Sequence, residues 1–555
     1  MKTHRPLLLP VLAIALGIAC PFVPAAPNES KPVPLIEGLG PYVRKITTSL
    51  PDAQRYFDQG LNFLFGFNHT MAIRSFQEAA RLDPACAMAH WGVALACGPH
   101  INLAIVLPPQ AEQAWNALAL AQAHSAKATP VEQALIRALA TRYANPQPEN
   151  RAPLDEAYAA AMREVWKAYP QDGDVGALFA EALMDLRPWD QWTPAGQPQP
   201  GTEEVLSVLD AVLALNARHP FANHLYVHAV EASPWPEKAI AAADRLRTLQ
   251  PGLAHNVHMP SHIDIRVGQW QQAVQSNLDA VAADKKFRAV VGPPKDFVAV
   301  YVAHNRHMLA WAAMMTGQSE LAITHIRAMV AEMPEEFLRD WASGVEGFAA
   351  MPFEVLVRFG RWDDVLAEPD HYPDYMPLTK TLRLAARAVA LAAKSDATAA
   401  RVEQAMFLET AKTIPAGNTF GNNTAEQILA VARPMVEGEI LVREGNLDAG
   451  FAALREAISA EDALRYDEPP GWILPVRHAL GASLMANGRY DEAEQVYRDD
   501  LKRLPDNGWS LFGLANALEM QRKHAEAAPV LAKFKQIWAK ADVTIKSSCF
   551  CQPGN

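Results

Sequence analysis

Histidines with helical spacing are concentrated in one part of the chain. Eight of the 17 histidines lie between residues 219 and 307 of the 555. The stretch 254–266 reads AHNVHMPSHIDIR and carries three of them, His255, His258 and His262, three and then four residues apart. Because an α-helix has 3.6 residues per turn, this spacing places all three on one helical face. Imidazoles gathered in this way are suited to holding a transition-metal ion.

Two flanking stretches repeat the pattern. NHLYVHAVE carries two histidines and Glu231, spaced four and three, and VAHNRHML carries two histidines three apart. We expect the three helices to stand side by side and to aim their imidazoles into one shared pocket. The candidate metal ligands are His224, His228, His255, His258, His262, His304 and His307.

Glu231 is the candidate catalytic residue. A carboxylate beside a histidine-bound ion can be a ligand, orient a histidine N–H, or act as general base on a metal-bound water. The arrangement is similar to that of HExxH zinc sites, where two histidines one turn apart share the metal. No HExxH occurs in this sequence, so no protease activity is implied. Neutral imidazole suits Cu, Fe and Zn, and both redox and hydrolytic chemistry stay open.

Two other interpretations compete with a metal site. The histidines could line a pocket for an anionic or aromatic ligand, or be polar groups that bind nothing. Two consecutive helices with the same histidine spacing favour the metal site. Pro260 adds an ambiguity, because proline kinks a helix or starts one. In the second case His255 and His258 would lie in a loop.

The elements that position these residues are predicted from a repeat. From residue 53 the chain reads AQRYFDQGLNFLFGFNHTMAIRSFQEAARLDP, and a second copy of the register starts at residue 474. Small, aromatic and proline residues recur at fixed positions of a 34-residue unit. In the first copy these are Tyr56, Gly60, Phe63, Ala72, Phe76, Ala79 and Pro84, and in the second Leu480, Gly481, Leu484, Gly488, Tyr490, Ala493, Tyr497 and Pro505.

This pattern resembles the tetratricopeptide repeat, a pair of antiparallel helices that stacks on the next pair. The resemblance implies an all-α superhelix in which the first helix of each pair lines a concave groove. The histidines and Glu231 then fall at groove-facing positions of three units that start near residues 220, 254 and 303. The predicted organisation is a signal peptide (1–26), a linker (27–52), N-terminal and central repeats with the histidine-rich groove (53–330), degenerate helical repeats (331–430), C-terminal repeats (431–540) and a tail (541–555).

The charge of the chain indicates which kinds of partner it can bind. The net charge is −11 and no basic block occurs, which argues against nucleic acid and anionic membrane surfaces. We expect a small molecule or a peptide in the concave groove. Tetratricopeptide proteins commonly bind peptides, so an interaction scaffold without catalysis, or a metal carrier, is the alternative to a metal-dependent enzyme.

The first 26 residues have the features of a signal peptide. Lys2 and Arg5 precede an apolar run at 7–19, and small residues follow at 25 and 26. The mature chain is therefore expected to be periplasmic or secreted. A lipid anchor at Cys20 is the less favoured alternative. No other apolar run is long enough to span a bilayer.

Overall fold

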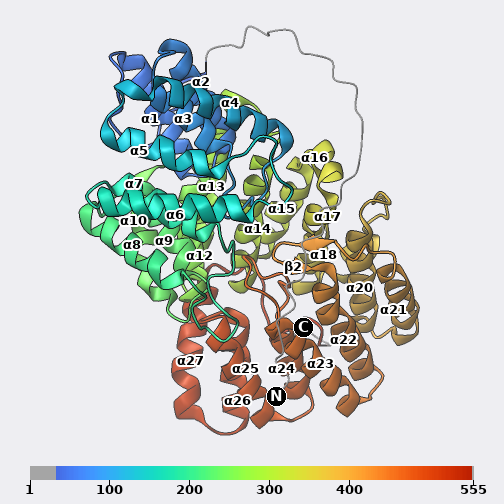
Figure 1. Ribbon diagram of the computed structural model, residues 1–555. Helices are drawn as coiled ribbons and strands as arrows, with labels where there is room; N and C mark the ends of the chain where they lie inside the picture. Colours follow the sequence, from blue (N-terminus) through green and yellow to red (C-terminus); the bar gives the residue numbers. More distant parts are fainter. Residues whose placement is uncertain (1–32, 553–555) are drawn as a thin grey trace, which may run out of the picture.

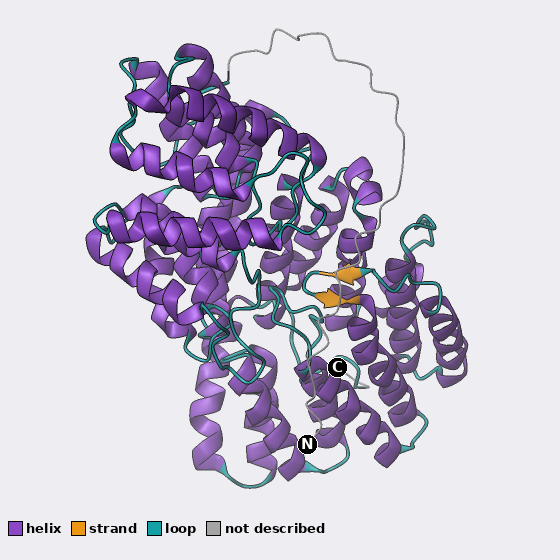
Figure 2. Ribbon diagram, viewed as in Figure 1, coloured by secondary structure: helices purple, strands orange, loops and turns teal. Residues whose placement is uncertain are grey.

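The computed structural model describes residues 33–552, and their regular secondary structure is almost entirely helical (Figure 1). The only paired strands in this range, β1 (Thr419–Phe420) and β2 (Asn423–Thr424), form a two-residue antiparallel hairpin (Figure 2). Successive helices pack antiparallel against their neighbours, and the pairs stack into a superhelix. The predicted all-α superhelix of tetratricopeptide-like helix pairs is confirmed.

The N-terminal and central part of the chain runs to residue 332. Its helices are α1 (Pro51–Phe65), α2 (His69–Leu82), α3 (Ala87–Ala96), α4 (Pro108–His124), α5 (Pro130–Leu139), α6 (Ala152–Ala168), α7 (Gly173–Met184), α8 (Thr202–Leu215), α9 (Pro220–Val230), α10 (Ile240–Leu249), α11 (Ala254–His258), α12 (Pro260–Arg266), α13 (Trp270–Val291), α14 (Val298–Met315) and α15 (Ser319–Glu332).

The remaining helices form the C-terminal part. They are α16 (Glu335–Asp340), α17 (Ala342–Val345), α18 (Met351–Arg358), α19 (Trp362–Ala367), α20 (Pro377–Ala393), α21 (Ala397–Ala411), α22 (Ala425–Arg443), α23 (Leu447–Asp462), α24 (Val476–Ala486), α25 (Tyr490–Arg503), α26 (Gly508–Met520) and α27 (His524–Ile537). Short 3-10 turns occur at Ser125–Lys127, Ala140–Arg142, Pro236–Ala239, Glu346–Ala350 and Trp538–Lys540.

Small residues allow the close helix crossings that the repeat requires. A Cβ atom on Gly60 of α1 would lie 2.7 Å from the ring of Phe76 on α2, and one on Gly92 of α3 would lie 2.5 Å from the same ring. Tyr497 on α25 makes the equivalent contact with two glycines, one on α24 and one on α26. The aromatic ring of one helix thus fills the space that the glycines of the helices before and after it leave open.

The superhelix curls until its C-terminal repeats touch its middle (Figure 1). The indole N–H of Trp270 on α13 donates to the carbonyl of Pro505, at 2.7 Å. The indole N–H of Trp509 on α26 donates to the carbonyl of Met314 on α14, also at 2.7 Å. These contacts bring loops of the C-terminal half next to the histidine-bearing helices.

The structure describes only part of the predicted N-terminal organisation. The signal peptide at 1–26 and the lipidation site at Cys20 lie outside the described residues. Within residues 33–552, no helix is both long enough and apolar enough to cross a bilayer. The described part of the segment predicted as a linker, residues 33–50, is coil that packs along α1 and α7, where Tyr42 and Arg44 bond to Asp174.

Candidate metal centre

Three histidines from two helices meet at one point. His224 and His228 lie one turn apart on α9, and His255 lies on α11. The Nε2 atom of His224 is 3.1 Å from Nε2 of His228 and 3.1 Å from Nε2 of His255. We refer to these three residues as triad A.

A second set of three histidines lies beside the first. His258 ends α11, His262 lies on α12, and His304 lies on α14. Nε2 of His262 is 2.6 Å from Nε2 of His258 and 3.3 Å from Nε2 of His304. We call this set triad B. The two triads are adjacent, as shown by the ring centroids of His228 and His262, which are 5.6 Å apart.

The outer nitrogens of the rings are held by hydrogen-bond acceptors. Nδ1 of His224 donates to the carbonyl of Phe65 at 2.7 Å. Nδ1 of His258 donates to Oδ1 of Asn277 at 2.7 Å, and the amide of Asn277 is oriented because its Nδ2 donates to the carbonyl of Ala273. A proton fixed on Nδ1 leaves the lone pair of a neutral imidazole on Nε2.

Glu231 links the two triads. Its Oε1 accepts from Nδ1 of His228 at 3.0 Å, and its Oε2 accepts from Nδ1 of His262 at 2.7 Å. Glu231 follows the last residue of α9, one turn after His228, so its carboxylate reaches α12 as well. Its position behind the rings is that of a carboxylate that orients metal-ligating histidines.

The inward-facing nitrogens fit a bound cation. The acceptors on Nδ1 direct the lone pairs of His224 and His228 toward each other across 3.1 Å, and two lone pairs form no hydrogen bond. An ion with four tetrahedral ligands and metal–nitrogen bonds of about 2.05 Å holds neighbouring nitrogens about 3.3 Å apart. Of the four Nε2 separations given above, three, at 3.1, 3.1 and 3.3 Å, agree with that spacing.

Burial keeps most of these imidazoles neutral. Loss of solvent lowers the pKa of His224, His255, His258 and His304 well below the ordinary value of 6.5, and the neighbouring histidines lower it further. A neutral imidazole has the free lone pair that a metal ion needs. The ligands are therefore ready to bind at neutral pH without first losing a proton.

His262 differs because two carboxylates contact it. Burial alone would lower its pKa, but Glu468 and Glu231 outweigh that effect and raise the pKa to about 10. Glu468 comes from the loop between α23 and α24 and forms an ion pair with Nδ1 of His262. Burial, together with the nearby charge of Glu231, raises the pKa of Glu468 to about 7. A proton on His262 can thus bridge to Nε2 of His258, and a metal ion in triad B would displace it.

Two aromatic residues with unusual backbone conformations cover triad A. Phe67 has φ of 55° and Trp189 has φ of 57°, in the left-handed region that side chains rarely adopt. The ring of Phe67 lies 4.4 Å from that of His224, and the ring of Trp189 lies 5.6 Å from that of His228, centroid to centroid. Such conformations cost free energy and cluster at functional sites.

A hydrogen-bonded chain fixes the second of these rings. Nε1 of Trp189 donates to Oδ1 of Asn102 at 3.1 Å, and Nδ2 of Asn102 donates to the hydroxyl of Tyr301 at 3.3 Å. The ring of Tyr301 packs against His255, 4.6 Å away. Segments from three distant parts of the sequence therefore enclose triad A.

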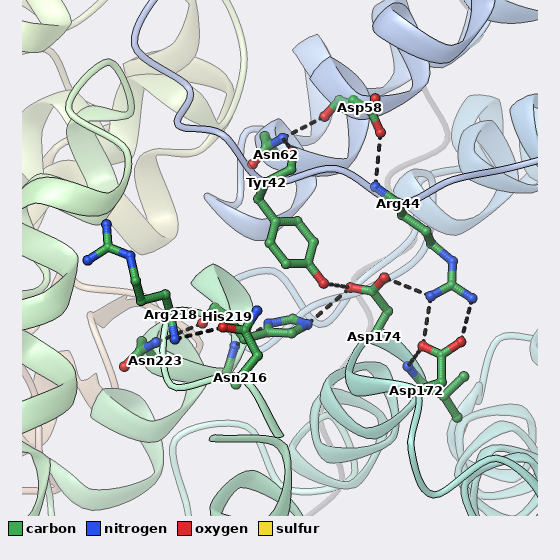
Figure 3. Close-up of polar contacts among 12 residues, drawn as sticks. Tyr42, Arg44, Asp58, Asn62, Asp172, Asp174, Asn216, Arg218, His219 and Asn223 are labelled. Atoms are coloured by element: carbon green, nitrogen blue, oxygen red, sulfur yellow. Dashed lines mark hydrogen bonds and ion pairs between the residues drawn. The ribbon is translucent and has the colours of Figure 1, made fainter. Parts of the chain in front are cut away.

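The start of α9 is anchored by a buried ion-pair network (Figure 3). Nδ1 of His219 accepts from the backbone N–H of Ala222 and so caps the helix, while its Nε2 donates to Asp174 at 3.0 Å. Arg44 bridges Asp172 and Asp174, with contacts of 2.7 Å to each. This network connects the N-terminal segment to the helix that carries two metal-ligand candidates.

The structure places six of the seven predicted ligand residues in the triads. His307 lies on α14 with His304, but its ring faces Phe348 and Phe420 rather than either triad. The ambiguity at Pro260 resolves as two short helices that meet at Met259, so His255 and His258 are helical. The histidines are also more buried than groove-lining residues would be, since five of the six ligand candidates are at most 6% exposed.

Sequence reasoning missed the groups that surround the ligands. Glu468 and Trp189 lie in loops far from the histidine-rich region, and their contacts with it arise only in the folded chain. Phe65 contributes a backbone carbonyl, which no side-chain pattern reveals. The stretches FGFNH at 65–69 and YDEPP at 466–470 contain turn-forming residues, and these are the signal that pointed toward Phe65 and Glu468.

Comparisons with known proteins identify no relative of this chain. No protein-family model matches the chain, and no curated protein matches it. Similar solved structures include the human IFIT1 dimer with m7Gppp-AAAA (12% identity, 89% of this chain and 92% of that chain, TM-score 0.33), the P58(IPK) TPR domain (12%, 85% and 99%, 0.23) and yeast Tom70 (11%, 87% and 92%, 0.28). These TM-scores are too low to transfer any property of those proteins to this chain.

Proposed function

We propose that this protein is a metal-dependent enzyme with two transition-metal ions, one held by each histidine triad. The observation that carries the proposal is the convergence of six Nε2 atoms in two groups of three, with the outer nitrogens of four rings bound to Phe65, Glu231 and Asn277. An all-imidazole ligand set suits Cu, Fe or Zn and does not suit Mg, Ca or Mn.

The number of ligands supports catalysis over a structural role. Structural zinc sites have four protein ligands, whereas catalytic sites have three and leave one position for water or substrate. Ions held here would supply Lewis acidity, and also redox chemistry if they are Cu or Fe. Glu231 would hold the rings of His228 and His262 in the ligating tautomer rather than react itself.

The burial of the site distinguishes this proposal from its alternatives. A metal carrier needs an exposed ion that exchanges readily, but His224, His258 and His262 are at most 1% exposed. A peptide-binding scaffold would use a polar groove open to solvent. The buried, roofed triads fit a small-molecule site better than either.

Elemental analysis tests the proposal. The tagless protein, purified from its native compartment, should contain about two equivalents of Cu, Fe or Zn per chain, since one ion per triad is expected. His224→Ala should remove the ion of triad A, and His262→Ala that of triad B, with the helical circular dichroism of both variants unchanged. Protein that holds none of these metals, and takes none up when they are supplied, would refute the assignment.

We further propose that the chain is exported and acts in the periplasm or outside the cell. The support is the positive, apolar and small-residue order of residues 1–26. N-terminal sequencing of the protein from fractionated cells should give a start near residue 27 in the periplasmic or secreted fraction. An intact Met1 in the cytoplasmic fraction would contradict export.

A further inference from the structure

A large cleft lies between the central repeats and the C-terminal repeats, next to the histidine triads. It encloses about 480 Å³, within the size range of small-molecule sites. One wall is the loop at 189–196 with the end of α12. The other is the segment 461–477, from the end of α23 to the start of α24, with the end of α25. Its two walls are therefore built by segments that the curling of the superhelix brings together.

The carboxylates that line the cleft all have partners within the described chain. Asp462 pairs with Arg477 at 2.6 Å, and Asp500 bonds to His478 at 3.0 Å. Asp467 accepts backbone N–H groups, from Asn422 at 2.7 Å and from Glu468. The remaining ones pair as follows: Asp190 with Arg187, Glu461 with Arg477, and Glu468 with His262. Each of these carboxylates therefore already has a hydrogen-bond or ion-pair partner within the described chain.

Arg266, like Arg465, is a cleft cation that forms no ion pair with a carboxylate of the described chain, whereas Arg477, Lys502 and Arg503 are paired. Arg266 ends α12, donates one N–H to the carbonyl of Ser233 at 3.2 Å, and its guanidinium lies 5.3 Å from the ring centroid of Tyr466. Among residues 33–552 no carboxylate forms an ion pair with it. A planar guanidinium with free N–H groups is suited to a carboxylate ligand, which it can bind through two parallel hydrogen bonds.

Two buried indole N–H groups in the cleft wall also lack partners. Nε1 of Trp311 and Nε1 of Trp472 have no hydrogen-bond acceptor among the described residues, although the side chains are 1% and 5% exposed. The hydroxyl of Tyr466 is buried and unpaired as well. Unpaired buried donors are costly and call for an acceptor. Together with Arg266 they supply hydrogen-bond donors to the cleft, with aromatic surface between them, and Oε1 of Glu468 is an unpaired acceptor in the same lining.

The cleft borders both triads. Trp189 lines the cleft and also packs on His228 of triad A. Glu468 lines the cleft and also contacts His262 of triad B. A molecule in the cleft is therefore separated from each set of candidate metal ligands by a single side chain.

We propose that this cleft binds a small aromatic carboxylate, with the carboxylate on Arg266 and the ring against the tryptophans and Tyr466. The anion would accept hydrogen bonds from the free guanidinium N–H groups, and the indole N–H groups would meet the oxygen substituents of the ring. The binding site stands on the cleft alone. Its role as the substrate site rests on the proposed metal-dependent function.

Isothermal titration calorimetry of the mature chain with benzoate tests the proposal, with benzyl alcohol and benzylamine as neutral and cationic matches. Benzoate should bind at least tenfold more tightly than either, because only it can form charge-assisted hydrogen bonds with Arg266. Arg266→Gln should remove that tenfold preference. The control Arg55→Gln, on the exposed face of α1, should leave benzoate binding unchanged.

Trp472→Phe provides a second variant that keeps an aromatic ring and removes the indole N–H together with the five-membered ring. It should leave benzoate binding in place and weaken the binding of 4-hydroxybenzoate several-fold, because the substituent oxygen loses its donor. Equal affinities for benzoate and benzyl alcohol, or a preference for benzylamine, would overturn the proposal. So would unchanged affinity in folded Arg266→Gln together with an unchanged 4-hydroxybenzoate affinity in Trp472→Phe.

Metal content measured on the same samples separates the two proposals. Benzoate binding by protein that takes up no metal would support the cleft site and refute the metal function. Two bound ions in protein that shows no preference for benzoate would support the metal function and refute the cleft site.

Discussion

Replacing Glu231 by glutamine should weaken one metal site and spare the other. Both carboxylate oxygens of Glu231 accept an N–H, one from His228 of triad A and one from His262 of triad B. A glutamine amide has one acceptor oxygen and one donor nitrogen. Because Glu468 still accepts from Nδ1 of His262, the amide N–H is expected to meet His228. His228 must then carry its proton on Nε2, where the proton blocks the lone pair needed for a metal.

The size of the effect follows from the loss of one orienting acceptor. Removing such a partner of a ligating histidine typically costs 10–100-fold in metal affinity, which corresponds to about 1.4–2.7 kcal/mol. Glu231 is 2% exposed, so water cannot replace the lost acceptor. We expect one ion to bind with wild-type affinity and the other to bind 10–100-fold more weakly.

Competition titrations of the metal-free protein with a chromophoric chelator measure both affinities. Glu237→Gln, an exposed glutamate in the turn after α9, serves as the matched control and should behave as wild type. Circular dichroism and thermal melting of the metal-free variants show whether the fold is kept. Two unchanged affinities in folded Glu231→Gln would refute the argument that this carboxylate sets the tautomers of both triads.

Three further outcomes are expected. His304→Ala should lower the metal content by one ion per chain, whereas His307→Ala on the same helix should leave it unchanged. Elemental analysis measures both. Equal losses of metal in the two variants would contradict the assignment of His304 to triad B. Arg44→Met should lower the free energy of unfolding in urea by roughly 3 kcal/mol, because it leaves the buried carboxylate of Asp174 without its ion-pair partner. Burial would raise the pKa of Asp174, but its bonds to His219 and Arg44 lower it, so the wild type should lose stability as the pH falls below about 3.9. That acid-induced loss should be smaller in Arg44→Met, and identical pH profiles of the two proteins would argue against the network.

The spacing of residues within a helix could be read from the sequence because it is a local property. His224 and His228 are one turn apart on α9, as are His258 and His262 across the junction of α11 and α12, and the structure keeps each pair within one triad. Glu231 also lies where its spacing from His228 places it. The helical repeats followed from glycines and aromatic residues at fixed intervals, because close crossings require small residues at those positions.

The sequence did not determine how the six histidines are distributed between triad A and triad B. His255 and His258 are three residues apart, which predicts that they share a face, yet His255 belongs to triad A and His258 to triad B. The division depends on which neighbouring helix each ring meets, α9 for the first and α14 for the second. That choice is made by the packing of whole helices and not by spacing along the chain.

Contacts with distant segments were decided by the tertiary structure alone. The carbonyl of Phe65 meets a histidine 159 residues further along the chain. Glu468 reaches His262 only because the superhelix curls back on itself, and the same curling forms the cleft beside the triads. Helical periodicity is fixed by about 3.6 residues per turn and can be read locally, whereas the curvature of the superhelix is the sum of many small rotations between neighbouring pairs.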